Sequence, residues 1–360
     1  MHFLFVFTLF IIYDDYIILF VLEQEVNLLK PIRIKNLEIK NPVILAPQAG
    51  ITDLPFRNLV SSFGGKDYAT SLTVSEMVPS ASQVYLLNKK KSNSKIKRLY
   101  ERYNSDTLTS VQIFGNDPAV MAESARINEE LGADIIDINM GCPVNKIVKN
   151  GCGSDLLRNP ELASKIIKSV VSSVNIPVSV KIRTGWNAET INAPEFAKMI
   201  EDSGASMLAI HGRTRSQLYS GTVDLDTIKK VKSSVLIPVI GNGDIFSEED
   251  AKKMLECTGV DGVMVGRGIY GAPWFLSHII YYLKTGEKLP EPSIQDKKEI
   301  LLHHISSMID YYGEKTGMLN ARKHIAWYSK GLRNSAEFRN FVNNSENINE
   351  VYEFIEKLFK

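Results

Sequence analysis

Short apolar segments alternate with longer amphipathic segments over most of this chain. From Pro42 onward each apolar segment ends in a polar or glycine-rich loop, and the stretches between them repeat apolar residues at helical spacing. This alternation is typical of βα units repeated around a parallel sheet. The segments that fit a strand are PVILAP from Pro42, DYAT from Asp67, TSVQIF from Thr109, DIIDIN from Asp134, PVSVKI from Pro177, SMLAIH from Ser206, PVIGN from Pro238 and GVMVG from Gly262.

Eight such strands with helices between them predict an α/β fold, a closed (β/α)8 TIM barrel. The helical segments 117–133 and 159–174 begin with Asp or Asn, which cap the exposed N–H groups of a first turn. Beyond residue 290 the apolar positions again follow helical spacing. We therefore expect a catalytic barrel over residues 30–288 and a small C-terminal helical domain over residues 289–360.

The first 25 residues do not follow this pattern. Residues 3–22 are strongly apolar, but Asp14 and Asp15 lie in their middle, and each carboxylate costs about 2.5 to 3.5 kcal/mol in a membrane-spanning helix. No Lys or Arg precedes the apolar stretch and no small-residue cleavage site follows it, so a secretion signal is not indicated. We expect residues 1–25 to be an atypical extension that lies outside the fold. It is either the product of an upstream translation start or a segment that docks only loosely on the rest of the protein. Peripheral membrane attachment through residues 3–22 is the less favoured alternative.

The overall charge does not select a partner. Lys and Arg number 42 against 41 Asp and Glu, so a nucleic-acid site must be a local patch. Cys142, Cys152 and Cys257 are too few for a disulfide framework, which favours a reducing, cytoplasmic setting. The cysteines form no CxxC pair and the histidines do not cluster with carboxylates, so we predict no metal site.

Polar and reactive residues gather where the predicted strands end, which is where a TIM barrel carries its catalytic groups. These residues, from the first strand to the last, are Pro47, Gln48, Ala49, Gln112, Asn139, Cys142, Lys181, Arg183, His211, Arg213, Arg215, Asn242, Gly243, Asp244, Gly266 and Arg267. We expect them to meet at one mouth of the barrel.

The loops after the seventh and eighth strands indicate a phosphorylated cofactor. Their glycines let backbone N–H groups approach a phosphate, and Arg267 can neutralise its charge, although tight turns alone would also use glycine. Lys181 could stabilise negative charge on a reduced flavin ring and Gln112 could hydrogen-bond that ring. The alternative for Lys181 is a structural ion pair.

Cys142 is the strongest chemical signal, because it follows a strand end and precedes a proline on a loop over the predicted mouth. A thiol with a pKa of about 8.5 is mostly protonated at neutral pH, which suits a general acid. We interpret Cys152 and Cys257 as small buried hydrophobes.

Taken together, these motifs resemble the tRNA-dihydrouridine synthases of bacterial type, flavin enzymes that reduce the C5=C6 bond of uridine in tRNA. The resemblance covers about residues 30–335 and is carried by APQAGITDLPFR, QIFG, DINMGCPVNKIVKNGCGSDLL, VKIRTGW, IHGRTRSQLYSG, PVIGNGDI, GVMVGRGIYGAPWF and ARKHIAWYSKGL. Two residues depart from the family pattern. Gln48 stands where methionine is expected, and Cys152 stands where alanine is expected. Inert packing is favoured for Cys152, and a second reactive thiol is the alternative.

The resemblance implies a bound FMN, reduced by NADPH or NADH, that delivers hydride to uridine C6 while Cys142 protonates C5 from the opposite face. It also implies a uridine flipped out of its stack. The residues that it assigns to FMN are Pro47, Gln48, Ala49, Gln112, Lys181, His211, Asn242, Gly243, Asp244, Gly266 and Arg267.

The implied partner is tRNA, and no obligate protein partner is indicated. Residues 89–102 carry seven basic residues and one acidic residue, and this segment is either a solvated loop or a phosphate-tracking loop. The residues that we expect to contact tRNA are Asn139, Lys146, Lys149, Arg183, Arg213 and Arg215 at the barrel mouth, with Arg322, Lys323, His324 and Tyr328 on a C-terminal helix.

Two other functions fit parts of the pattern. An FMN-dependent oxidoreductase for small pyrimidines, of the dihydroorotate dehydrogenase type, would explain Cys142 and Lys181 but not the C-terminal helices. A tRNA-binding protein with a merely structural flavin would not need Cys142. Fold alone does not decide among these functions.

Overall fold

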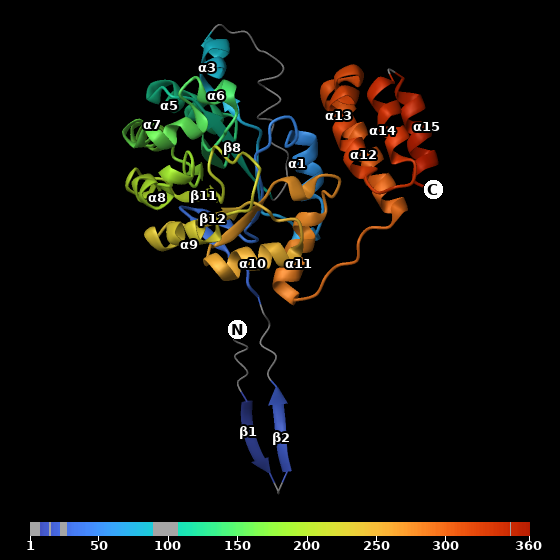
Figure 1. The fold of residues 1–360 in the computed structure, drawn as a ribbon, viewed down its shortest axis with the longest axis horizontal. Helices are drawn as coiled ribbons and strands as arrows, with labels where there is room; N and C mark the ends of the chain where they lie inside the picture. The colour runs from blue at the N-terminus through green and yellow to red at the C-terminus, as the bar shows by residue number, and fades with distance from the viewer. Residues whose placement is uncertain (1–7, 14–15, 22–26, 89–106, 346) are drawn as a thin grey trace.

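A continuous ring of hydrogen bonds joins eight parallel strands into a closed barrel (Figure 1). The ring closes where the second and third strands pair, Leu72 opposite Leu108. The computed structural model describes residues 8–13, 16–21, 27–88, 107–345 and 347–360. The barrel strands are β5 (Val43–Leu45), β6 (Leu72–Val74), β8 (Leu108–Phe114), β9 (Ile135–Met140), β10 (Val178–Arg183), β11 (Met207–His211), β12 (Val239–Asn242) and β13 (Gly262–Val265), and β7 (Val78–Pro79) pairs with the end of β8. The predicted TIM barrel is confirmed.

One predicted strand was wrong. Residues 65–68 form the short helix α2 (Gly65–Tyr68), and Asn41 Nδ2 donates hydrogen bonds to the carbonyl groups of Asp67 and Ala69 there. The second barrel strand lies a few residues later, at β6, where Leu72, Thr73 and Val74 are all buried. Strand geometry favours β-branched and apolar side chains that fit the barrel wall, and DYAT offers fewer of them than LTV.

Helices follow the strands and surround the barrel (Figure 1). In the two predicted segments, α5 begins after Asp117 and α7 after Asn159, whose side chains accept hydrogen bonds from backbone N–H groups of the first turn. The helices of the barrel are α1 (Leu54–Ser61), α3 (Ser80–Asn88), α5 (Pro118–Glu130), α6 (Asn145–Val148), α7 (Pro160–Ser173), α8 (Ala193–Asp202), α9 (Leu225–Ser234), α10 (Glu248–Thr258) and α11 (Phe275–Thr285), with short 3₁₀ helices η1 (Gly153–Arg158), η2 (Ala188–Thr190) and η3 (Arg267–Ile269).

The barrel interior is apolar at one end and polar at the other. At the amino ends of the strands, inward residues such as Ile44, Ile135 and Ile240 pack on a hairpin of β3 (Ile32–Ile34) and β4 (Leu37–Ile39). Because side chains alternate along a strand, the next inward positions toward the carboxyl ends fall on polar residues, namely Asp137, Asn139, Gln112, Ser179, Lys181, His211 and Asn242. The strand alternation therefore places a polar pocket over an apolar core.

Four further helices form a bundle with a core of its own, α12 (Ile294–Tyr312), α13 (Glu314–Tyr328), α14 (Ser335–Asn344) and α15 (Ile348–Leu358). The bundle lies beside α1 of the barrel, as Figure 1 shows. Tyr312 Oη donates a hydrogen bond to Asp53 Oδ2 at 2.9 Å across this interface. The ring of Phe56 packs on the rings of His304 and His324, with centroids 5.3 and 5.2 Å away. Barrel and bundle are thus joined by both apolar and polar contacts.

At the N-terminus, β1 (Thr8–Tyr13) and β2 (Tyr16–Val21) pair with each other as an antiparallel hairpin. Among the residues that the structure describes, no helix has the length and apolar character needed to cross a membrane.

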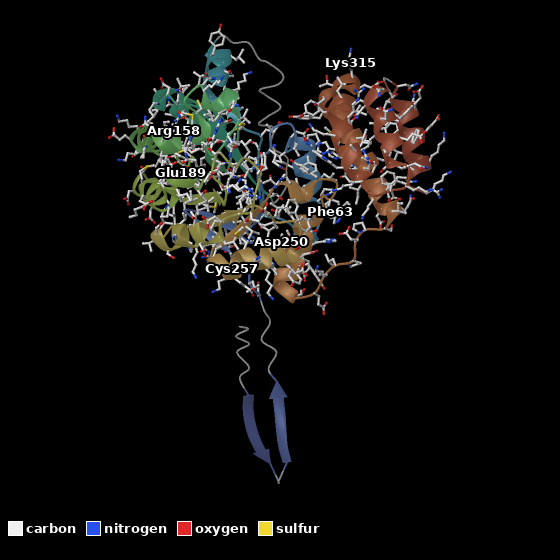
Figure 2. The ribbon with its side chains drawn as sticks, viewed as in Figure 1. Phe63, Arg158, Glu189, Asp250, Cys257 and Lys315 are labelled. Atoms are coloured by element: carbon white, nitrogen blue, oxygen red, sulfur yellow. The ribbon has the colours of Figure 1, made fainter. Side chains whose placement is uncertain are left out.

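The cysteines outside the mouth differ in exposure. Cys152 is buried, as expected, but Cys257 is exposed on α10, on the outside of the barrel (Figure 2), so the interpretation of Cys257 as a buried hydrophobe was wrong. On α10 the buried stripe consists of Ala251, Met254, Leu255 and Thr258. Helical spacing places Cys257 on the opposite, solvent-facing side.

Candidate active site

The carboxyl ends of the barrel strands surround a cavity of about 280 Å³. Nine of the eleven residues predicted to hold a cofactor line it, namely Pro47, Gln48, Ala49, Gln112, Lys181, His211, Asn242, Gly243 and Arg267, and Cys142, Asn139 and Arg183 line it as well. Asp244 and Gly266 do not line the cavity. The carboxylate of Asp244 instead lies behind it, where Arg213 binds it through two hydrogen bonds of 2.8 and 2.7 Å.

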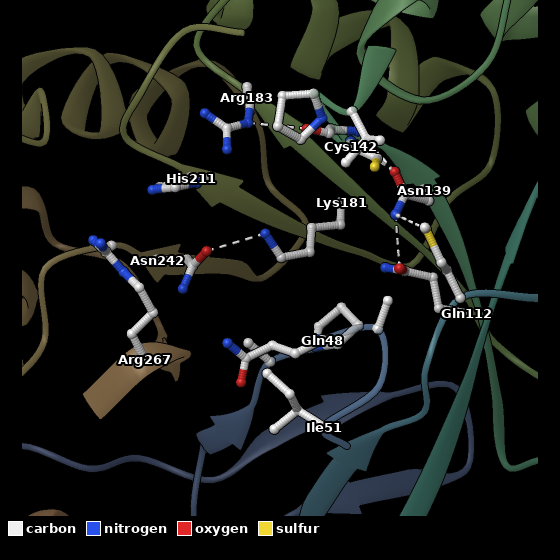
Figure 3. Close-up of a pocket in the computed structure, with 18 of the residues that line it drawn as sticks. Gln48, Ile51, Gln112, Asn139, Cys142, Lys181, Arg183, His211, Asn242 and Arg267 are labelled. Atoms are coloured by element: carbon white, nitrogen blue, oxygen red, sulfur yellow. Dashed lines mark hydrogen bonds between the residues drawn. The ribbon is translucent and has the colours of Figure 1, made fainter. Parts of the chain in front are cut away.

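Among the described residues that line this cavity, the charged side chains are cationic. Lys181, Arg183 and Arg267 line it, and no Asp or Glu is among the described residues that do. Lys181 Nζ donates to Asn242 Oδ1 at 3.0 Å, and burial together with the nearby Arg183 lowers the pKa of Lys181 to about 8 (Figure 3). Burial and the surrounding cations lower the pKa of His211 well below its usual value, so its ring is neutral. The cavity therefore favours anionic groups.

A chain of hydrogen bonds leads from the barrel interior to Cys142. Asp137 is buried and accepts from Ser179 Oγ and from Gln112 Nε2, each at 2.6 Å. Gln112 Oε1 accepts from Asn139 Nδ2 at 2.7 Å, and Asn139 Oδ1 accepts from the backbone N–H of Cys142 at 2.9 Å (Figure 3). Each amide is thus oriented by its neighbour, and the last one fixes the backbone of the reactive cysteine.

The loop that carries Cys142 is also held by contacts with Ser154 and Gly153. Ser154 donates to the carbonyl oxygen of Cys142 through both its N–H, at 3.1 Å, and its Oγ, at 2.9 Å. Gly153 has a φ of +63°, and a Cβ there would lie 2.8 Å from the same carbonyl, so the position requires glycine. Burial raises the pKa of the Cys142 thiol above its usual value, which keeps the thiol protonated at neutral pH.

Arg183 has a structural as well as an electrostatic role. Its guanidinium donates to the carbonyl groups of Gly141, Thr214 and Leu218 at 2.8 to 2.9 Å, which ties the Cys142 loop to the loop after β11. Burial lowers its pKa to about 10.

Sequence reasoning assigned no role to several residues that line the cavity, namely Ala46, Ile51, Met77, Gly141, Pro143, Val144, Tyr219 and Tyr270. Tyr219 is 57% exposed, and the guanidinium groups of Arg183 and Arg267 lie 5.7 and 5.0 Å from its ring centroid. Tyr219 and Tyr270 both belong to motifs that carried the family resemblance, IHGRTRSQLYSG and GVMVGRGIYGAPWF. Membership of those motifs was the signal that could have identified them.

Among the residues predicted to contact tRNA at the mouth, Lys146 and Lys149 are exposed and Arg215 is partly exposed. Arg215 Nη2 donates to Asn145 Oδ1 at 2.6 Å, and its guanidinium lies 4.7 Å from the Trp186 ring centroid. Arg213 does not fit the prediction. It is 2% exposed, and its guanidinium binds Asp244 and the carbonyl groups of Ser220 and Gly221. All of its nitrogen atoms are thereby directed into the protein instead of toward a phosphate.

The predicted basic face on α13 is largely an internal surface. His324 and Tyr328 are buried, and Arg322 Nη2 donates to the carbonyl of Ser345 at 2.8 Å. His324 and Tyr328 share the buried stripe of α13 with Met318, Ala321 and Ile325, because residues three and four apart lie on one side of a helix. Lys323 is partly buried and lies beside Gly50 of the barrel. The assignment of His324 and Tyr328 to an RNA-facing surface was therefore wrong. Residues 89–102 lie outside the described residues.

Comparison with known proteins gives concordant results. A family model described as dihydrouridine synthase matches residues 44–360. A probable tRNA-dihydrouridine synthase from Rickettsia bellii (strain RML369-C) is 49% identical over 312 residues, which cover 87% of this chain and 93% of that protein. The tRNA-dihydrouridine synthase B of Vibrio vulnificus (strain CMCP6) is 44% identical over 311 residues, covering 86% and 93% of the two chains. A solved structure of histamine dehydrogenase from Rhizobium sp. 4-9 has a TM-score of 0.55 at 12% identity, covers 78% of this chain and 51% of that chain, and shares the barrel fold.

Proposed function

This chain belongs to the dihydrouridine synthase family, and on that premise we propose that it reduces the C5=C6 bond of uridines in tRNA. The proposed cofactor is FMN, bound in the cavity at the barrel mouth, and the proposed reductant is NADPH or NADH. The observation that carries the proposal is that Cys142 shares one cavity with the cations Lys181, Arg183 and Arg267. A proton donor and positive charge are both needed where a uracil ring receives a hydride.

The residues that line the cavity fit FMN. Three cations without a lining carboxylate suit a phosphate and a flavin ring that becomes negatively charged on reduction. Gln48 Oε1 is buried without a hydrogen-bond partner among the described residues, so it can accept a bond from a bound group. The residues that would hold the cofactor are Pro47, Gln48, Ala49, Gln112, Lys181, His211, Asn242, Gly243 and Arg267. Asp244 would not contact the cofactor but would orient Arg213 and Arg267, which donate hydrogen bonds to its carboxylate. Gly266 would contribute only its backbone groups.

FMN, when bound, would supply the hydride for C6 of uracil, with NADPH or NADH as its reductant. Hydride addition at C6 would place an electron pair on C5, where the S–H bond of Cys142 would break to deliver the proton. The resulting thiolate takes a proton from solvent, so the net reaction consumes one nicotinamide cofactor and one proton for each dihydrouridine. Because burial raises its thiol pKa, Cys142 starts each cycle in the protonated form.

The tRNA would approach along the rim of the mouth. Lys146 on α6, Lys149 directly after α6 and Arg215 on the loop after β11 would bind phosphates. Asn139 and Arg183 lie deeper, where the flipped uridine would enter. We assign residues 30–288 to the catalytic domain and residues 289–360 to a helical domain that orients the tRNA. In this second domain Arg322 and Lys323 are partly exposed and are the remaining candidates for RNA contact.

The test is nucleoside mass spectrometry of tRNA that lacks dihydrouridine, after incubation with the protein, FMN and NADPH. We expect dihydrouridine from the unchanged protein, a strong loss in Cys142→Ala, and full activity in Cys152→Ala, which removes the other thiol of this region. Dihydrouridine formation that is equal in all three proteins would contradict the role of Cys142. A flavin-loaded protein that oxidises NADPH without modifying tRNA would contradict the substrate, and small pyrimidines would then be tested.

A further inference from the structure

The nitrogen atom of the Gln48 carboxamide makes a hydrogen bond, whereas its oxygen atom has no partner among the described residues. Its Nε2 donates to the hydroxyl of Tyr270 at 2.8 Å, whereas its Oε1 is buried and has no hydrogen-bond partner within the described part of the chain. Both residues line the cavity, and Figure 3 shows the carboxamide of Gln48 on the side opposite Cys142. An unpaired buried acceptor is destabilising, so a partner that supplies an N–H or O–H group is expected at this position.

Tyr270 is itself held from outside the barrel. Its ring stacks on Trp327 of α13, with centroids 4.0 Å apart and ring planes 10° apart. The next residue, Gly271, has a φ of +74°, and a Cβ there would lie 2.7 Å from the carbonyl carbon and oxygen of Trp327. The barrel loop and α13 are therefore in direct contact, and the stacked pair fixes the ring that positions Gln48.

Trp327 in turn is fixed by the helical bundle. Its ring meets the ring of His324 edge to face, with centroids 5.2 Å apart, and His324 packs on Phe56 of the barrel. Contacts therefore run without interruption from α13 through Trp327 and Tyr270 to the carboxamide of Gln48. The end of this series is the unpaired Oε1 in the cavity wall.

We propose that Gln48 Oε1 accepts a hydrogen bond from an N–H group of the bound flavin ring, and that Tyr270 and Trp327 are positioning residues that aim this oxygen. The C-terminal helical domain thereby contributes to the cofactor site as well as to substrate binding. This inference rests on the proposed function, because it takes FMN as the occupant of the cavity. A methionine at this position would offer only a thioether, which is a weak acceptor, so Gln48→Met removes the proposed contact.

The test measures the dissociation constant of FMN for the full-length apoprotein by quenching of flavin fluorescence, without tRNA. We expect Gln48→Met and Tyr270→Phe each to weaken FMN binding about fivefold, as the loss of one hydrogen bond would. The double variant should bind no more weakly than either single variant, because both remove the same bond. Trp327→Phe should preserve the stack and the affinity, whereas Trp327→Ala should bind like Tyr270→Phe.

Two readouts separate this role from a general loss of stability. The absorption spectrum of the bound flavin should shift in Gln48→Met and Tyr270→Phe but not in Tyr281→Phe, a matched change on α11 outside the cavity. Equal FMN affinity and spectra in the unchanged protein and Gln48→Met would overturn the inference while leaving the proposed function intact. An unchanged protein that binds no FMN would overturn both.

Discussion

Asn139 accepts a hydrogen bond from the backbone N–H of Cys142 at 2.9 Å, and this bond is the last in a series that starts at the buried Asp137. The position of the thiol is therefore set from inside the barrel as well as by its own loop. Proton transfer requires a donor within about 2.6 to 3.2 Å of its acceptor, so a small displacement of Cys142 has a large effect.

Replacing Asn139 tests this relationship. Asn139→Ala should slow dihydrouridine formation by roughly 10- to 100-fold, because the Cys142 backbone loses its acceptor and the thiol is misplaced. Oxidation of NADPH in the absence of tRNA does not use the thiol and should be nearly unchanged. Single-turnover mass spectrometry and NADPH absorbance measure the two steps separately.

Asn175→Ala is the control, because Asn175 is exposed before β10 at the opposite end of the barrel. Equal losses in both steps would contradict a role in positioning Cys142.

The charge of Lys181 should make cofactor binding depend on pH. Since the pKa of Lys181 is lowered to about 8, the ammonium is present below that pH and is lost as the pH rises through it. FMN affinity should fall by about tenfold between pH 7 and 9, as the loss of a charge-assisted contact predicts. Titration of the apoprotein with FMN over this range measures the effect. The dependence should vanish in Lys181→Met and persist in Cys142→Ala, and a pH dependence retained in Lys181→Met would assign it to another group.

The two arginines of the loop after β11 should respond differently to replacement. Arg213→Met leaves the Asp244 carboxylate without its bidentate partner and should lower the free energy of unfolding by about 3 to 5 kcal/mol. Arg215→Met should leave stability nearly unchanged and weaken tRNA binding, with a smaller dependence of affinity on salt. Urea unfolding and tRNA binding at two salt concentrations measure these effects. Comparable stability of the two variants would show that the Arg213 pair is not structural.

Asp53 should make the stability of the domain interface depend on pH. Burial raises the pKa of this carboxyl group to about 6, although Phe56 N–H and Tyr312 Oη both donate to it. Because the pKa in the folded protein exceeds the usual 3.8, stability falls as the pH rises from about 4 to about 6. Relative to Asp53→Asn, the unchanged protein should lose about 3 kcal/mol over this range, measured by urea unfolding at each pH. Parallel stability curves for the two proteins would contradict the assignment.

The barrel and most of its pocket could be predicted because both depend on local regularities. Residues such as Lys181 and His211 occupy strand positions whose direction follows from alternation, so their convergence follows once eight strands are identified. The strand at residues 72–74 was missed because only three residues form it, and so short a segment shows no clear periodicity. The pattern therefore favours the DYAT segment a few residues earlier.

The remaining errors concern contacts between distant segments. The sequence places Arg213 and Arg215 on one loop, but only the fold shows that Asp244 turns the first one inward. Likewise His324 belongs to a basic motif, and its burial depends on where α13 docks against Phe56. Such pairings depend on tertiary packing, which no local pattern encodes.

The contact between Gly271 and Trp327 limits how this protein can be recombined. The segment between α11 and α12 is an obvious fusion point for a chimera that joins this barrel to the helices of another protein. Yet any side chain larger than hydrogen at residue 271 would collide with the backbone of α13. A working chimera must therefore keep glycine at residue 271 and preserve the close approach of α13 to this barrel loop, so the joint between the two parts depends on more than the linker.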